Sequence, residues 1–154
     1  MGCAAKENIA ELRDYKTAYP KMILCDAAFT HGGIGKSYGT IPVPPFGVPA
    51  VGCNKFDKEV SWKMDTLGAT ILHEYTHYMA LMAPHPLLKE TADVAYGPHG
   101  VQHMQKKHAL YNGDSYNWFA TENLWTNLCN TNYLPALNKG DDPGCFGVCK
   151  AFKG

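Results

Sequence analysis

The chain has 154 residues, of which 45% are hydrophobic, and this length suits one globular domain with one core. Lys+Arg and Asp+Glu are equal at 14 each, so no global field attracts nucleic acid or an anionic membrane surface. No apolar run approaches the roughly 20 residues that a membrane-spanning helix needs. We therefore expect residues 1–154 to form a single domain without nucleic-acid or membrane partners, whose specificity comes from a local site.

The cysteines favour an oxidising compartment. Six are present, an even number without a CxxC pair, and their wide spacing is typical of three disulfides. The alternative is a set of buried free thiols. Cys25 and Cys53 flank a Gly/Pro-rich stretch, and we expect them to pair. A secreted protein is expected; because residues 1–16 lack the apolar core of a signal peptide, it would be a mature domain.

The first elements expected along the chain are a helix, a strand and a loop region. Residues 4–19 carry apolar side chains at helical spacing before Pro20, which predicts a surface helix. Residues 21–25 are a short apolar run that suits a strand. Residues 30–53 are rich in Gly and Pro, which favour hairpins and loops over helix.

A central helix is expected next. Asp65 can cap it, and it should run to about Met82, just before a proline-containing stretch. Its apolar residues surround most of its circumference. Such a helix should be buried.

The sequence predicts two further helices. One is expected over roughly 98–112, with a proline in its first turn and Gly113 as its C-terminal stop. Asp114 or Ser115 then caps another that runs to about Cys129.

Residues 73–77 read HEYTH, an HExxH motif on the expected central helix. Residues four apart share a helix face, so His73 and His77 can bind one Zn²⁺ at roughly 2.0–2.1 Å. Glu74 stands beside the metal without binding it, and its carboxylate can take a proton from the water that zinc activates and deliver it to the leaving amine. The motif predicts peptide hydrolysis. The alternative is a chance HExxH whose histidines have other partners.

A catalytic zinc needs a third protein ligand. A histidine six residues after His77 would fall at Ala83, so the longer metzincin pattern is absent. Glu122 lies in ATEN, but the following Asp of a thermolysin-type helix is missing.

Residues 91–97, TADVAYG, resemble the signature GTxDxxYG of the deuterolysin (aspzincin) family. Residues 108–120, HALYNGDSYNWFA, are similar to the family's AL-x-N-x-DSY-x-x-FA segment, and the similarity covers about residues 62–125. The resemblance implies that Asp93 is the third zinc ligand and that Tyr96 donates its phenol to the developing oxyanion. Both roles are chemically sound, because carboxylate oxygen is a normal zinc ligand and a placed donor stabilises developing charge.

Two departures from the signature affect the loop before Asp93. Glu90 replaces the first Gly, and sixteen positions separate His77 from Asp93, more than we expect for the family. Neither change removes a ligand, but the path of the loop and the nearby substrate sites should differ.

The resemblance also concerns specificity. In the lysine-preferring branch of the family, two carboxylates line the pocket for the side chain after the scissile bond, and the Asp of DSY, here Asp114, supplies the first. The second lies three residues on, where this chain has Asn117. We therefore expect Asp114 to bind substrate with a weak preference for Lys. The alternative is that Asp114 only caps the helix that starts at Ser115.

Other histidines and tryptophans receive structural interpretations. His99 and His103 are also four apart on an expected helix, but no acid or third ligand is evident beside them, so we interpret them as exposed or core histidines. Trp62, Trp118 and Trp125 are expected in the core, the last two on one helix face.

Together these observations predict a mainly helical α+β fold: a zincin-like metalloprotease domain with a short antiparallel sheet beside a buried HExxH helix. We expect a monomeric, secreted zinc endopeptidase with one Zn²⁺ per chain and protein or peptide substrates. One alternative is a secreted binding or effector module that keeps a structural zinc site without proteolysis. Another is a hydrolase of non-peptide amides.

Overall fold

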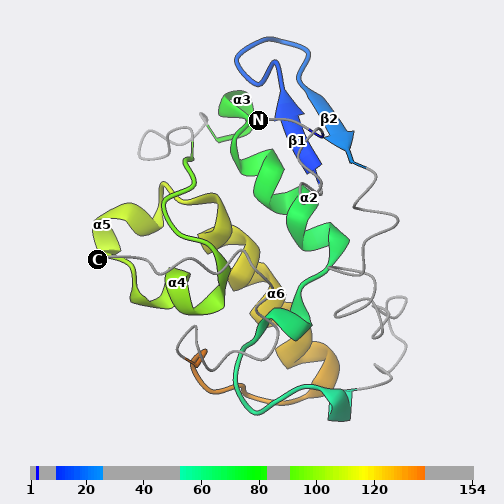
Figure 1. The fold of residues 1–154 in the computed structure, drawn as a ribbon, viewed down its shortest axis with the longest axis vertical. Coiled ribbons are helices and arrows are strands. Elements are labelled where there is room, and N and C mark those ends of the chain that lie inside the picture. Colours follow the sequence, from blue (N-terminus) through cyan, green and yellow to red (C-terminus); the bar gives the residue numbers. More distant parts are fainter. Residues whose placement is uncertain (1–2, 4–9, 26–52, 83–90, 138–154) are drawn as a thin grey trace.

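The computed structural model describes residue 3 and residues 10–25, 53–82 and 91–137. These residues form a mainly helical structure with a two-stranded antiparallel sheet, which confirms the α+β class (Figure 1). The elements in chain order are β1 (Ala10–Arg13), β2 (Lys21–Leu24), the 3-10 turns η2 (Cys53–Lys55) and η3 (Trp62–Met64), α2 (Leu67–Thr76), α3 (Met79–Met82), α4 (Gly97–His103), α5 (Lys106–Ala109) and α6 (Gly113–Cys129).

The hairpin β1–β2 replaces the helix expected over residues 4–19. Ala10 pairs with Leu24 and Arg13 with Lys21, and Asp14 starts the turn at a left-handed φ of 55°. The local pattern favours a helix, but pairing of β1 with β2 decides the outcome. Strand formation depends strongly on such tertiary context. The helix prediction is wrong for residues 10–19; the strand expected at 21–25 is confirmed.

Helix α2 carries the first four residues of HExxH, with His77 as its C-cap, and its two ends differ from expectation. Its cap is Thr66, not Asp65, and the Thr66 hydroxyl accepts from the Ala69 amide at 3.1 Å. At the other end the Thr76 hydroxyl donates to the His73 carbonyl at 2.7 Å. This hydroxyl competes for a backbone acceptor, which favours ending the helix there, and α3 continues the chain as a separate turn.

The helix expected over 98–112 is two short helices, α4 and α5. It breaks because Met104 is extended and buried, and its sulfur accepts from the Ser115 hydroxyl at 3.6 Å. Gly113 does not stop a helix but begins α6, whose N-cap is Asn112. The predicted capping role of Asp114 is therefore wrong, whereas the end of α6 at Cys129 is confirmed.

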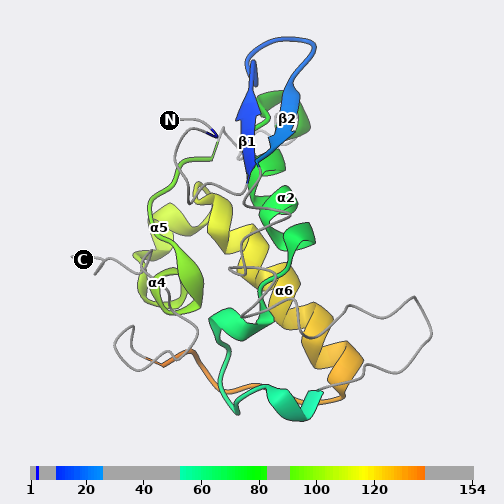
Figure 2. The ribbon, with the colours of Figure 1, turned by 45° about the vertical axis from the view of Figure 1, so that its right-hand side comes forward.

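Helices α2 and α6 lie side by side through the middle of the molecule, and the hairpin sits at the far end of α2 (Figures 1 and 2). Below α2 a buried cluster forms around Trp118 and Trp125, which are 3% and 1% exposed. The Trp125 indole donates to the Met64 carbonyl at 2.7 Å, and Trp62 packs edge-on against Trp118. The predicted core role is confirmed for Trp118 and Trp125, while Trp62 is half-buried and packs against the cluster, which fixes α6 beneath α2.

Two disulfides join described residues, Cys3 to Cys25 and Cys53 to Cys129. The predicted bridge between Cys25 and Cys53 is therefore wrong. The second bridge ties η2 to the end of α6, which a spacing argument could not predict. The other two cysteines lie outside the described residues. Among the described helices, none has the length and apolar character that crossing a membrane requires.

Candidate metal centre

Helix α2 and the segment 91–97 bring three potential metal ligands together. Asp93 Oδ1 lies 3.1 Å from His73 Nε2 and 3.3 Å from His77 Nε2, and the two Nε2 atoms are 3.3 Å apart. Four ligands around zinc at roughly 2.0–2.1 Å lie about 3.3 Å from one another. The three atoms therefore match three corners of a zinc tetrahedron, with the fourth corner left for a non-protein ligand.

His73 is oriented by Asp114, which projects from the first turn of α6. Its Nδ1 donates to Asp114 Oδ1 at 2.7 Å, and both residues are buried, at 7% and 4% exposure. The other carboxylate oxygen accepts from the Gly97 amide at 2.7 Å, and Asn117 donates to Oδ1 at 3.3 Å. Because Asp114 holds the proton of Nδ1, Nε2 is the nitrogen that can bind a metal, and this is the atom that faces Asp93.

His77 is oriented by a chain of hydroxyl groups. Its Nδ1 lies 3.1 Å from the carbonyl oxygen and 3.0 Å from the hydroxyl of Thr91. The Thr91 hydroxyl is 2.8 Å from that of Thr76, which itself donates to the His73 carbonyl. One direction satisfies every group: Nδ1–H donates to Thr91, Thr91 donates to Thr76, and Thr76 donates to His73. With Nδ1 engaged in this way, Nε2 is the nitrogen of His77 that can bind a metal.

The loop that carries Asp93 is held by Asn112, which is fully buried. The Asn112 side-chain oxygen accepts from the Val94 and Ala95 amides at 2.9 and 3.0 Å. The Ala92 amide donates to the Tyr111 carbonyl at 2.7 Å. These bonds fix the loop against the start of α6, so Asp93 reaches the histidines despite the long spacing from His77.

Two glycines permit the close approach of these elements. Gly97 has a φ of +76°, and a Cβ there would come 2.4 Å from the Trp62 ring. A Cβ at Gly113 would come 3.0 Å from the Thr76 hydroxyl and 3.2 Å from the His73 ring. Position 97 therefore requires glycine, both for its backbone conformation and because the Trp62 ring leaves no room for a side chain.

Glu74 lies on α2 beside the three ligands. Its Oε2 accepts from the backbone amide of Leu12 in β1 at 3.0 Å, which joins the hairpin to the HExxH helix. Burial raises the pKa of Glu74 above its usual range, although the nearby histidines oppose this. A raised pKa suits a carboxylate that must accept and then release a proton.

Tyr96 stands at the exposed side of the centre, with 48% of its surface accessible. Its ring stacks on His73 with centroids 5.9 Å apart and planes inclined by 22°. Burial of the phenol and its hydrogen bond to Asp93 raise the pKa of Tyr96, so the hydroxyl keeps its proton and remains a donor.

The acid–base balance of the ligand set fits a divalent cation. Burial alone would lower the pKa of His73, but the hydrogen bonds to Asp114 and Asp93 outweigh it and raise this pKa to about 10. Burial opposes ionisation of Asp93, yet hydrogen bonds from His73 and His77 lower its pKa well below the usual range. The centre thus attracts positive charge, and a bound cation would take the place of these protons.

The structure brings together every site residue named from the sequence: His73, Glu74, His77, Asp93, Tyr96 and Asp114. It adds Thr76, Thr91 and Asn112, which the sequence reasoning did not assign. Thr76 lies in the HEYTH motif and Thr91 in the TADVAYG segment. Their residue types could be read from the sequence, but only the folded chain brings their hydroxyls together. Glu90, the departure from the signature, lies outside the described residues.

An HExxH sequence with two oriented imidazoles, a nearby carboxylate and an adjacent glutamate is typical of the zinc metallopeptidase class. The model of the lysine-specific metallo-endopeptidase (aspzincin) family matches residues 51–121, slightly less than half of the chain and the part that contains all these residues. Over these residues the chain is similar to this family of zinc-dependent metalloendopeptidases, and the match supports the resemblance drawn from the motifs. No curated protein and no solved structure matches the chain.

Proposed function

We propose that the protein is a secreted, single-domain endopeptidase in which His73, His77 and Asp93 bind one zinc ion and Glu74 is the general base. The observation that carries the ligand assignment is the spacing of 3.1–3.3 Å among the three donor atoms. Three protein ligands, rather than four, are typical of a catalytic zinc with an open position. The two disulfides support export to an oxidising compartment.

When bound, zinc would lower the pKa of a coordinated water and polarise the scissile carbonyl. Glu74 accepts the proton of the attacking water and passes it to the leaving amine. The Leu12 amide holds one oxygen of this carboxylate and so limits its rotation. The general base is thus placed by a strand and by a helix at once.

The phenol of Tyr96 donates a hydrogen bond to the oxygen on which negative charge develops. Its raised pKa supports this role, because the hydroxyl remains protonated at neutral pH. Stacking on His73 fixes the ring beside the metal ligands, while its exposure leaves the hydroxyl side open to a peptide.

Asp114 is proposed to orient His73 in addition to any contact with substrate. Its two oxygens already accept from His73, Gly97 and Asn117, and 4% of the residue is exposed. A buried carboxylate with these partners attracts a lysine ammonium mainly through its charge. With Asn117 at the place of the second acid, we propose a weak preference for Lys after the scissile bond.

The proposed general base is tested with Glu74→Gln, since the amide keeps the shape and can still accept from the Leu12 amide but cannot take the proton. Zinc-loaded wild type should cleave casein and a mixed peptide library, lose activity with a chelator and regain it with zinc. Glu74→Gln should bind zinc equally and show no turnover. Glu122→Gln on α6 is the matched control and should be fully active.

Residual activity of Glu74→Gln within a few-fold of wild type would identify another group as the base. A wild-type protein that binds zinc stoichiometrically and cleaves no peptide would instead support a binding or effector module with a structural zinc site. Among the described residues no fourth protein ligand joins the centre, and this favours the peptidase.

A further inference from the structure

Asn112 stands at the N-cap of α6, but its side chain does not serve that helix. Asparagine is favoured at this position because its side-chain oxygen can accept from an amide in the first turn. In this structure the side chain makes no such bond to α6. Its oxygen instead accepts from the amides of Val94 and Ala95, and its amide group donates to the Ser115 hydroxyl at 3.2 Å. The side chain therefore has a role in the loop of Asp93 that helix capping does not explain.

Bonds from the start of α6 hold the chain on both sides of Asp93. Before it, the Ala92 amide donates to the Tyr111 carbonyl, and the Ala92 carbonyl accepts from the Gly113 amide at 3.1 Å. After it, the two amides that Asn112 binds follow directly. Because 39% of the Asp93 side chain is exposed, packing contributes little to its position. Without the Asn112 side chain, the residues directly after Asp93 would lose this anchor.

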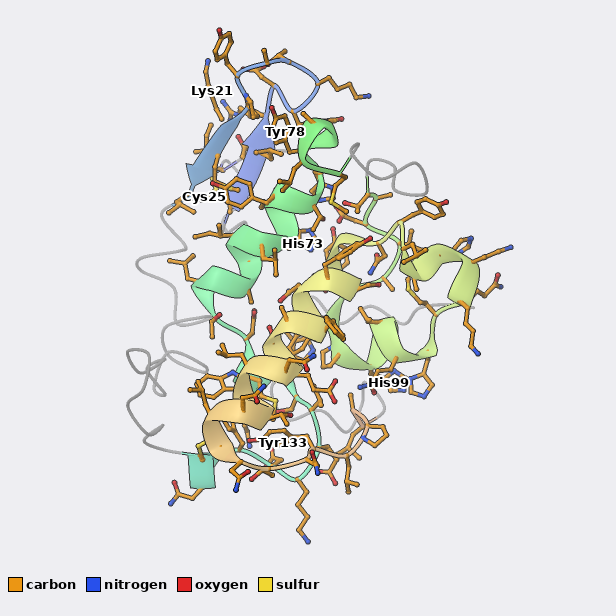
Figure 3. All side chains as sticks on the ribbon, turned by 180° about the vertical axis from the view of Figure 1, so that it is seen from behind. Lys21, Cys25, His73, Tyr78, His99 and Tyr133 are labelled. Carbon is orange, nitrogen blue, oxygen red and sulfur yellow. A yellow bond between two sulfur atoms is a disulfide. The ribbon has the colours of Figure 1, made fainter. Side chains whose placement is uncertain are left out.

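The same turn of α6 also holds His73. Asp114, two positions after Asn112, accepts from His73 Nδ1 at 2.7 Å, and in Figure 3 His73 lies between α2 and the beginning of α6. Residues 112 and 114 thus fix one proposed ligand each, and the first turn of α6 sets the distance between the two attachments. The spacing of 3.1 Å between Asp93 Oδ1 and His73 Nε2 depends on both of them.

We propose that Asn112 is a positioning residue of the metal centre, which holds Asp93 at the distance from His73 that one zinc ion requires. The proposal rests on the proposed ligand set and extends it by a residue that does not touch the ion. Asn112 is fully buried and acts through the loop. A loop that already holds Asp93 in place loses less conformational entropy when the ion binds. Zinc affinity, and not only activity, should therefore depend on this side chain.

Asn112→Ala tests this role, because it removes the acceptor and leaves the two loop amides unpaired. Competition with a chromophoric chelator should show a loss of zinc affinity of roughly 10–100-fold, the range for outer partners of metal ligands. Asn112→Asp keeps an oxygen at the same place and should restore the affinity to within a few-fold of wild type. Asn112→Ser, whose hydroxyl is too short to reach both amides, replaces Asn112→Ala if that variant does not fold.

Val60→Ala is the matched control for a loss of stability alone. Val60 is 1% exposed in the core cluster around the tryptophans, so the variant should unfold more easily. Its zinc affinity, measured well below the melting temperature, should equal that of wild type. A loss in Val60→Ala as large as that in Asn112→Ala would show that zinc affinity only follows stability, and would overturn the proposal.

A double-mutant cycle shows whether Asn112 acts through Asp93. In the Asp93→Ala background the carboxylate is absent, so Asn112→Ala should lose no further affinity. An equal loss in both backgrounds, or an Asn112→Asp as weak as Asn112→Ala, would overturn the positioning role. Wild-type affinity in Asn112→Ala, together with a loss in Asp93→Ala, would reject this role alone. Unchanged affinity in Asp93→Ala would reject the proposed ligand set and the role of Asn112 together.

Discussion

The backbone amide of Leu12 donates to the carboxylate of Glu74 at 3.0 Å across 62 positions of sequence. Leu12 pairs with Met22 in the hairpin, and its amide points away from β2 toward α2. The contact places a strand edge next to the proposed general base. In the proposed mechanism the hairpin therefore helps to position the general base.

Shortening this side chain tests the contact. Glu74→Asp keeps the charge but shortens the side chain by one methylene. The shorter carboxylate cannot accept from the Leu12 amide and contact the attacking water at the same time. We expect kcat to fall roughly 10²-fold with zinc occupancy unchanged. Steady-state kinetics on a fluorogenic peptide measure this, with Glu122→Asp as control. Full activity of Glu74→Asp would show that the Leu12 contact is dispensable.

Asp93→Ala should weaken zinc binding at the centre, because it removes a third of the protein ligands. The loss of zinc affinity should exceed the roughly 10–100-fold loss that follows removal of a hydrogen-bond partner of a metal ligand. Competition with a chromophoric chelator measures the affinity. Asp57→Ala, which removes a carboxylate paired with Lys63 at 2.6 Å elsewhere, should bind zinc as wild type does. Unchanged affinity in Asp93→Ala would reject the ligand assignment.

Tyr96→Phe should lower kcat by roughly 10²–10³-fold, the usual effect of losing one oxyanion donor. Phe keeps the stacking on His73, so the ring position is preserved and the hydroxyl alone is removed. Tyr19→Phe, at a tyrosine that is 83% exposed, is the control. An effect confined to KM would instead assign Tyr96 to substrate binding.

Asp114→Asn separates orientation from specificity. If the carboxylate orients His73, the variant should lose about 10–100-fold in zinc affinity or activity, with the cleavage profile unchanged. If it binds substrate, a preference for Lys should disappear from the library profile. Asn127→Ala, at an exposed position of α6, is the control for stability. A variant with wild-type affinity, activity and profile would contradict both roles.

Asp65 predicts a pH dependence of stability. Burial, and next the charge of Asp114, raise its pKa from 3.8 to about 7. Because the folded pKa lies above the unfolded one, this group stabilises the fold fully below about pH 4, and the contribution is lost as the pH rises through 7. Asp65→Asn imitates the protonated form and still accepts from the Thr66 amide.

The free energy of unfolding of Asp65→Asn, relative to wild type, should therefore increase between pH 5 and pH 8 by up to about 3 kcal/mol. Urea denaturation at the two pH values measures it, and comparison with wild type cancels the pH dependence of the other groups. A difference that does not change with pH would show that Asp65 is ionised throughout.

The sequence alone identified the candidate residues of the centre. HExxH places His73 and His77 on one face by helix geometry, and the letters of residues 91–97 supplied Asp93 and Tyr96 by resemblance. The tryptophans at 118 and 125 were expected in the core because helical spacing and apolar surface decide burial directly. These inferences succeed because each depends on local periodicity or on residue chemistry.

Tertiary structure decided what depends on distant partners. Residues 10–13 form a strand because Lys21–Leu24 offers a ladder, although the local pattern is helical. Asp114 orients His73 instead of capping α6, because the approach of α2 places an imidazole beside it. The hydroxyl chain from His77 through Thr91 to Thr76 joins two motifs, and its direction is fixed only by counting donors in the folded site. Such pairings depend on how whole elements are placed relative to one another, and the spacing of residues along the chain does not reveal that placement.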